Sequence, residues 1–87
     1  MNNKQKLPEW FQGVLYKHGE EVTNPFSGES IELTPEELSI YDFIIGAQMI
    51  LEMKLNASKR VDIIKDMSRG ISWFQHANSK AYMVLLD

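Results

Sequence analysis

Two histidines and a few carboxylates are the side chains of this sequence that could bind a metal ion. His18 and His76 are the only histidines, and carboxylates such as Asp42, Glu52 or Asp66 would have to complete a site. No pair of these residues has the spacing of a metal-binding motif. The chain has no cysteine, which excludes disulfides, thiolate metal sites and a cysteine nucleophile. We predict no metal and no cofactor, with His18 in a turn and His76 facing solvent.

Acidic residues on predicted helices are the other candidates for chemistry. Asp62 and Asp66 lie one helical turn apart, and Lys65 and Arg69 are close enough to neutralise them, so we interpret them as a solvated helix face. Asp42 lies among apolar residues, where a carboxylate would be partly buried and would need a donor. We interpret Asp42 as a structural polar group, with an interface contact and catalysis as alternatives. We predict no catalytic residue and no enzyme.

Phosphate and nucleic-acid binding have little support in the residue pattern. The five glycines stand singly, so there is no phosphate-binding loop, and Ser27 and Ser72 lack a visible histidine–acid partnership. The best set for stacking single-stranded bases is Trp10, Phe11 and Tyr16. The basic residues beside them are few, namely Lys4, Lys6 and Lys17. We interpret these aromatics as core residues.

The residues from Thr34 to Leu55 are predicted to form the helix that organises the chain. Thr34 and Glu37 have the spacing of a capping box, and Pro35 suits the first helical position. Apolar residues occur on nearly every side of this helix, as two stripes (Leu38, Tyr41, Ile45, Met49 and Ile40, Ile44, Ala47, Leu51) and a third side with Phe43 and Ile50. A helix of this kind is buried in a core or covered by a partner. We favour completion by a second copy or another chain, and the alternative is a helix wrapped by the protein's own elements.

The flanking elements are shorter. Residues 13–33 predict a β-hairpin or a three-stranded meander, with strands at 14–16, 21–24 and 30–33 and turns at His18-Gly19 and Asn24–Gly28. A second helix from about Lys59 to Ala77 has a clean apolar face, with Gly70 inside it and Trp73 on its polar side. A last short helix is expected over residues 80–86, capped by Ser79. Residues 9–11 are expected to dock on the core as a turn.

Composition limits the chain to one small domain, residues 1–87, with residues 1–8 flexible and residues 34–87 helical. We predict an α+β fold that is mainly helical. The net charge is −3, and the basic residues are scattered instead of forming the patch of a nucleic-acid binder. No signal peptide is visible, and the apolar run from Phe43 to Leu51 is too short to cross a bilayer. We expect a cytoplasmic protein that does not bind membranes.

Surplus apolar surface is therefore the leading functional signal. The predicted interface consists of Leu38, Tyr41, Ile45, Met49, Trp73, Tyr82, Leu85 and Leu86. A homodimer with a protein–protein interaction or assembly function is our leading hypothesis. A nucleic-acid-associated accessory factor is the alternative, and a small enzyme with a polar cleft around Asp42 or His76 is a third. For Trp73 we leave open that it caps the core beneath Trp10 and Phe11.

Parts of the sequence also resemble a family of short uncharacterised proteins encoded by large tailed phages of marine bacteria. The resemblance covers most of the chain from Trp10 onward and is strongest at Asn24–Gly28, Leu38–Phe43, Trp73-Phe74 and Tyr82–Asp87. The family has no assigned activity, so the resemblance implies no site residue. It implies expression in the cytoplasm of an infected bacterial cell, with a host or phage protein as a possible partner.

Overall fold

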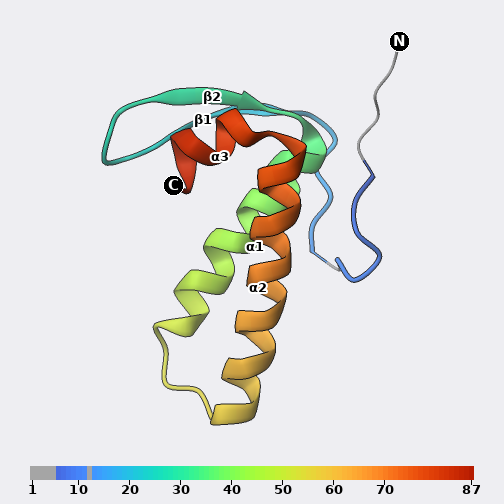
Figure 1. Ribbon diagram of the computed structural model, residues 1–87, viewed down its shortest axis with the longest axis vertical. Coiled ribbons are helices and arrows are strands. Elements are labelled where there is room, and N and C mark those ends of the chain that lie inside the picture. The colour runs from blue at the N-terminus through green and yellow to red at the C-terminus, as the bar shows by residue number, and fades with distance from the viewer. Residues whose placement is uncertain (1–5, 12) are drawn as a thin grey trace.

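The computed structural model describes residues 6–11 and 13–87. A β-hairpin precedes three helices, which confirms the predicted α+β, mainly helical fold (Figure 1). The elements are β1 (Glu20–Thr23), β2 (Ser30–Leu33), α1 (Pro35–Leu51), α2 (Ala57–Ala77) and α3 (Ser79–Leu85). The helices α1 and α2 form an elongated antiparallel hairpin, and the sheet and α3 lie together at one end of it. We call this the sheet end, and we call the opposite end, residues 52–60, the tip.

The sheet has one polar and one apolar face. Its antiparallel strands place Val22 opposite Ile31 and Glu21 opposite Glu32. Because side chains alternate along a strand, Val22 and Ile31 face inward, where both pack against the core. Two strands alone are marginal in water, so this packing on the helices is what stabilises the hairpin.

The turn between the strands has the predicted Asn24–Gly28 geometry. The Asn24 side-chain oxygen accepts hydrogen bonds from the backbone N–H of Phe26 at 2.8 Å and of Ser27 at 3.3 Å. Gly28 has φ of 80°, a conformation that glycine adopts without steric cost. The Asn24 amide nitrogen also donates to the Val84 carbonyl oxygen at 2.8 Å. One side chain therefore shapes the turn and ties it to α3.

The predicted strand over residues 14–16 is wrong, and the sheet is a hairpin instead of a meander. The Tyr16 backbone N–H donates to the Ser39 hydroxyl of α1 at 3.0 Å, so it is satisfied by a helix side chain and not by a neighbouring strand. Val14 and Leu15 are exposed, at 66% and 60%. The β propensity of these residues did not produce a strand, because neither β1 nor β2 pairs with them.

The helix boundaries follow their caps. The capping box of Thr34 and Glu37 is present, as predicted. Helix α1 ends at Leu51, four residues before the predicted end, and the Arg60 guanidinium donates to the Leu51 carbonyl oxygen at 3.0 Å. Asn56 caps α2, which begins two residues earlier than predicted. Asn78, and not Ser79, caps α3.

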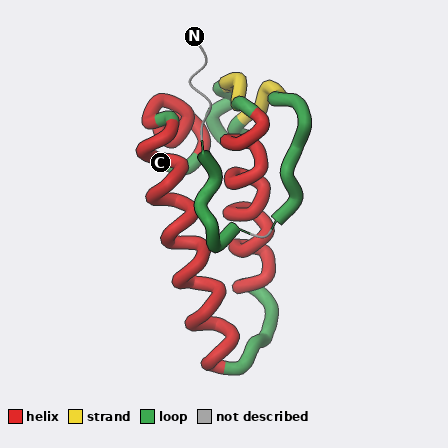
Figure 2. The backbone as a smooth tube through the Cα atoms, turned by 90° about the vertical axis from the view of Figure 1, so that its right-hand side faces the viewer, coloured by secondary structure: helices red, strands yellow, loops and turns green. Residues whose placement is uncertain are grey.

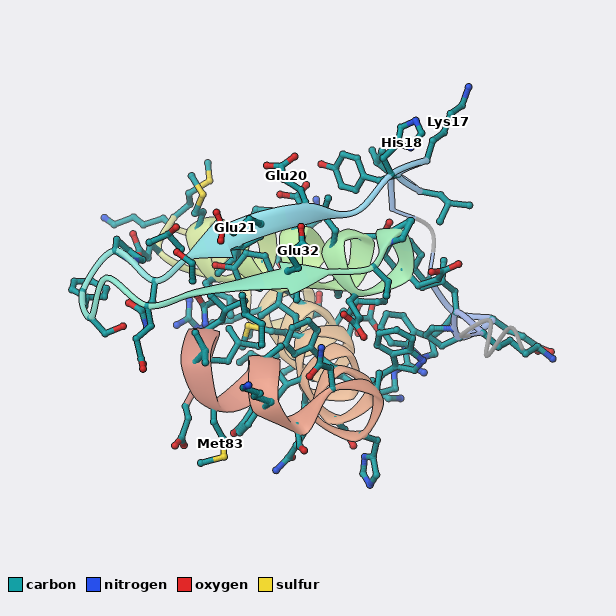
Figure 3. All side chains as sticks on the ribbon, turned by 90° about the horizontal axis from the view of Figure 1, so that it is seen from above. Lys17, His18, Glu20, Glu21, Glu32 and Met83 are labelled. Carbon is teal, nitrogen blue, oxygen red and sulfur yellow. The ribbon has the colours of Figure 1, made fainter. Side chains whose placement is uncertain are left out.

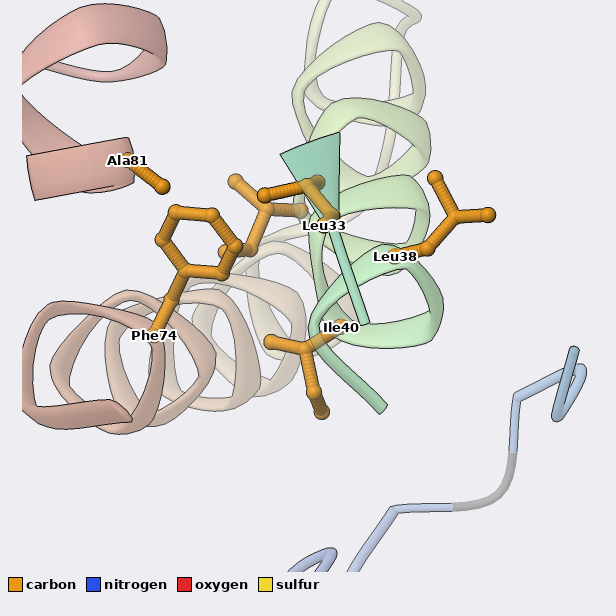
Figure 4. Packing of buried hydrophobic residues seen from close by; sticks show 6 residues of the cluster. Leu33, Leu38, Ile40, Phe74 and Ala81 are labelled. Atoms are coloured by element: carbon orange, nitrogen blue, oxygen red, sulfur yellow. The ribbon is translucent and has the colours of Figure 1, made fainter. Parts of the chain in front are cut away.

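The core lies at the sheet end. It contains Leu33, Leu38, Ile40, Ile44, Phe74 and Ala81, so every layer of the fold contributes to it. Phe74 of α2 lies against Ala81 and Leu33, whereas Leu38 points to the other side of α1 (Figure 4). At Gly70 an added Cβ would lie 3.4 Å from Ile44 and 3.5 Å from the Phe43 ring, so the glycine allows α2 to approach α1 closely.

The segment before the sheet docks on the two long helices, as predicted for residues 9–11 (Figure 2). The Phe11 N–H donates to the Pro8 carbonyl oxygen at 3.1 Å, which forms the expected turn. The ring centroids of Trp10 and Phe11 lie 5.7 and 5.9 Å from that of Phe43. Leu7 also packs against the core. Flexibility was predicted for residues 1–8, of which residues 1–5 lie outside the described residues.

A buried polar junction holds the sheet end together. Glu37 is only 3% exposed, and its side-chain Oε1 accepts hydrogen bonds from the Thr34 N–H and from the Asn78 amide, each at 3.1 Å. The Asn78 side-chain oxygen accepts from the Ala81 N–H at 3.0 Å. The start of α1 is therefore tied to the start of α3.

Removing this junction is expected to destabilise the fold. Glu37→Ala should lower the free energy of unfolding by about 2–4 kcal/mol, because it leaves the Thr34 N–H and the Asn78 amide without this acceptor. Glu37→Gln keeps an acceptor oxygen and should lower it by about 1 kcal/mol, through loss of the charge near the α1 N-terminus. Urea unfolding followed by circular dichroism measures both. Equal losses for the two variants would contradict the role given to the acceptor oxygen.

Candidate functional site

The clearest candidate site is an apolar groove between α1 and α2. It has a volume of about 210 Å³ and is lined by Phe43, Gly46, Ala47, Ile50, Ile63 and Asp66. Among the described residues of this lining, Asp66 is the only titratable side chain, and the others are apolar. Such a surface can bury another apolar group, but it holds no set of polar atoms for catalysis or for a metal ion.

The groove exists because one face of α1 is covered over only half of its length. Tyr16 and the Trp10–Phe11 turn cover α1 at Ser39 and Phe43. Beyond Phe43 the same face continues through Gly46 and Ile50, following the spacing of a helix face. Towards the tip, α1 and α2 are the only described elements that lie beside each other (Figures 1 and 2). One neighbouring helix cannot cover the whole surface of a helix that is apolar on all sides.

The side chains beside the groove are correspondingly exposed. The exposed fractions are 65% for Met49, 43% for Ile50 and 63% for Met53. Val61 and Ile64 of α2 are also exposed, at 62% and 45%. At about 100° per residue, these two project away from the side on which Ile63 and Asp66 line the groove. We call Gly46, Met49, Ile50 and Met53, together with the groove lining, the groove face.

The polar rim of the groove is neutralised within the protein. The Arg69 guanidinium pairs with the Asp66 carboxylate and also lies over the Trp10 ring, 4.8 Å from its centroid. This confirms the predicted neutralisation of Asp66 on a charged helix face. A second cavity, lined by Trp10, Gly13, Phe43 and Asp66, shares two residues with the groove. The two cavities therefore adjoin at Phe43 and Asp66, where Trp10 and Gly13 of the N-terminal segment line the second one.

Gly46 has no packing function among the described residues. An added Cβ there would meet no atom within 4 Å, unlike one at Gly70. A glycine in a helix interior destabilises the helix by about 1 kcal/mol relative to alanine. The close approach of α1 and α2 explains Gly70, whereas no contact made by the described residues explains Gly46.

Charge is distributed unequally between the two ends of the molecule. Residues 20–37 contain six glutamates and no lysine or arginine, whereas the tip, residues 52–60, contains three basic side chains and one acidic side chain. Glu20, Glu21 and Glu32 lie together on the two strands at the sheet end (Figure 3). The sheet end is therefore acidic and the tip region basic.

The predicted interface residues on α1 divide between the core and the surface. Leu38 is 9% exposed and belongs to the core, and Tyr41 is half-buried with its ring 6.1 Å from that of Phe74. Ile45 is also half-buried. Met49 is the exposed member of the set on α1, at 65%, and it belongs to the groove face. Gly46, Ile50 and Ile63 complete that face but were not in the predicted set.

The remaining predicted interface residues pack within the protomer. Trp73, Tyr82, Leu85 and Leu86 are half-buried against the core. The Trp73 indole N–H donates to the Lys6 carbonyl oxygen at 3.1 Å, so the N-terminal segment covers this side chain. The position of Trp73 agrees with the alternative in which it caps the core under the N-terminal segment.

Asp42 is exposed, and not partly buried as predicted. Its carboxylate accepts a hydrogen bond from the Tyr16 hydroxyl at 2.8 Å, so it has the donor that the prediction required. This hydrogen bond raises the pKa of Tyr16, and burial together with the Asp42 charge raises the pKa of Tyr41. The arrangement fixes the N-terminal segment to α1 and stabilises two neutral phenols.

The histidines do not form a site. His18 is exposed next to the sheet, and exposed His76 donates from Nδ1 to the Ser72 carbonyl oxygen at 2.8 Å. Within residues 6–11 and 13–87, no three His, Asp or Glu side chains are placed to hold a metal ion. The same part of the chain has no helix with the length and hydropathy needed to cross a membrane.

A second exposed apolar feature lies at the end of the β-hairpin. Phe26 is 96% exposed, on the turn that the Asn24 side chain fixes. The sequence pattern predicted this turn but gave no sign that it presents an aromatic ring to solvent. An aromatic side chain has only two χ angles, so it loses little conformational entropy on binding.

Comparisons with protein-family models, with curated proteins and with solved structures find no match to this chain. The resemblance to a phage protein family therefore stays a prediction. The functional argument has to rest on the groove face and on the charges around it.

The tyrosines give a direct test of the Asp42 contacts. Asp42→Asn is expected to lower the pKa of Tyr16 most and that of Tyr41 less, because burial is the larger cause for Tyr41. Both pKa values are raised by folding, so the stability they contribute is full below about pH 10 and is lost as the pH rises through the folded-state pKa values. Absorbance at 295 nm measures the titrations. An unchanged titration curve in Asp42→Asn would contradict the hydrogen bond.

Proposed function

We propose that this protein is a non-enzymatic interaction protein that associates with a second copy of itself through the groove face. The observation that carries the proposal is the exposed apolar surface beside the groove, which Met49 and Ile50 of α1 and Met53 just beyond its end provide. Contiguous exposed apolar patches on small proteins mark interaction sites. A second α1–α2 hairpin laid on this face would complete a four-helix arrangement and bury the patch.

Charge supports a second copy as the partner. Each molecule has an acidic sheet end and a basic tip region, so each supplies the complement of the other. Complementary potentials favour encounter and fix orientation. An assembly function follows from this association, because a homodimer presents two copies of every remaining surface. The proposed setting is the bacterial cytoplasm that the sequence resemblance implies.

Ile50 tests the groove face. Ile50→Lys should raise the dissociation constant of the dimer at least about 100-fold, because it places an unpaired charge in an apolar interface. Sedimentation equilibrium and multi-angle light scattering measure this change.

The control is Ile64→Lys, which alters a side chain of nearly equal exposure outside the groove face. It should leave association unchanged. Circular dichroism should show that both variants are folded, because both side chains already contact solvent. A wild-type protein that stays monomeric at millimolar concentration would overturn the proposal, and so would a dimeric Ile50→Lys.

A separate partner contact is favoured by Phe26. Its ring is exposed on the turn of a hairpin whose strands carry Glu20, Glu21 and Glu32, an arrangement that suits a protein with an apolar pocket bordered by basic residues. A host or phage protein as partner would bind at this surface.

Phe26→Ser is expected to change neither the stability of the protein nor its self-association. The side chain makes almost no contact in the protomer, so the free energy of unfolding should shift by less than about 0.5 kcal/mol. Thermal unfolding and light scattering measure the two properties. If the variant were monomeric while the wild type is dimeric, Phe26 would belong to the self-interface and the second surface would be rejected.

A further inference from the structure

We infer that the α1 helices of two copies cross in antiparallel orientation at Gly46, so that Met49 and Ile50 of each copy enter the groove of the other. This inference rests on the proposed self-association and specifies its geometry. It gives Gly46 a packing function, which the described residues of one copy do not supply.

Gly46 is the point on α1 where another helix can come closest. It lies in the helix interior, and no atom within 4 Å would meet a Cβ added there. Phe43, Gly46, Ala47 and Ile50 follow the three- and four-residue spacing that forms a helix–helix seam. A residue without a side chain at the centre of such a seam lets two backbones approach. The seam is open on its outer side in the described structure.

The seam is complementary to itself. A two-fold axis near Gly46 pairs the side chains that precede the glycine in one copy with those that follow it in the other. Phe43 of one copy then faces Met49 of the other, because each lies three residues from the crossing. An interface of this type uses the same surface patch on both molecules and closes as a dimer. The groove and the side chains that fill it are thus parts of one patch.

The charges select the antiparallel orientation. A parallel crossing would place the two acidic sheet ends side by side, with six glutamates in residues 20–37 of each copy. An antiparallel crossing separates the sheet ends and turns the basic tip region of each copy towards the acidic end of the other. Like-charge contacts oppose association and opposite charges favour it. The same reasoning predicts that association weakens as salt is raised.

Gly46→Ala gives a test in which two measurements move in opposite directions. In dilute solution the variant should unfold at a temperature about 4–8 °C higher than wild type, because alanine favours the helix and its methyl group meets no atom of the protomer. Its dissociation constant should be at least about tenfold larger, because the methyl group separates the crossing backbones. The rise of unfolding temperature with protein concentration, expected for a dimer, should be weakened.

Gln48→Ala is the matched control, since Gln48 is exposed and lies on the side of α1 away from Gly46. It should leave association unchanged. A Gly46→Ala variant that dimerises as the wild type does would overturn the crossing at Gly46. A Gly46→Ala variant that unfolds at a lower temperature in dilute solution would also overturn it, because the position would then be filled within the protomer. Either outcome would reject only the crossing at Gly46. The Ile50→Lys experiment tests the proposed self-association separately.

Orientation is measured separately. The chain has no cysteine, so Ser58→Cys provides a single site at the tip for a spin label. At about 1.5 Å of rise per residue, the antiparallel crossing should place the two labels about 25 Å or more apart. Tips lying side by side, within about 15 Å as expected from the spacing of packed helices, would overturn the antiparallel arrangement.

Discussion

The structure depends on how a helix that is apolar on nearly every side is covered by a chain of 87 residues. The first half of α1 is enclosed by β2, α2 and the N-terminal segment, and its Ile40 and Ile44 are fully buried. Within residues 6–11 and 13–87, α2 is the only element that packs against the second half. Burial of apolar area is the main favourable term in folding, so a small chain covers such a helix only as far as its elements reach. The first half of α1 therefore forms part of the core, and the second half forms part of the interaction surface.

Polar contacts explain why the covering elements gather at the sheet end. The Glu37 carboxylate joins the start of α1 to the Asn78 side chain, which begins α3. Asn24 ties the β-turn to the last turn of α3, and the Tyr16 hydroxyl holds the N-terminal segment on Asp42. Each of these bonds joins residues distant in sequence. The connection near the tip is held by the local Arg60 contact to the Leu51 carbonyl oxygen, and the described part of the chain shows no comparable long-range hydrogen bond from it to a further element.

Local signals predicted most of the fold, because caps and turns are formed by residues close in sequence. The Thr34–Glu37 capping box and the Asn24–Gly28 turn are examples. The strand at residues 14–16 was predicted wrongly, because a strand requires a partner that sequence propensity does not supply. The excess apolar surface of α1 was also evident from sequence. The sequence did not show which side of α1 remains uncovered, because that side depends on the docking of Trp10 and Phe11 against Phe43.

The two helix glycines show what only the structure adds. In the sequence, Gly46 and Gly70 carry the same helix penalty, and close packing is the expected explanation for either. The structure supplies that packing for Gly70 against Ile44 and Phe43, and it supplies none for Gly46. An exposed apolar seam is also an aggregation hazard unless a defined partner covers it. A glycine at the centre of that seam, between an acidic and a basic end, limits the ways in which two copies can meet and so favours one dimer over indiscriminate association.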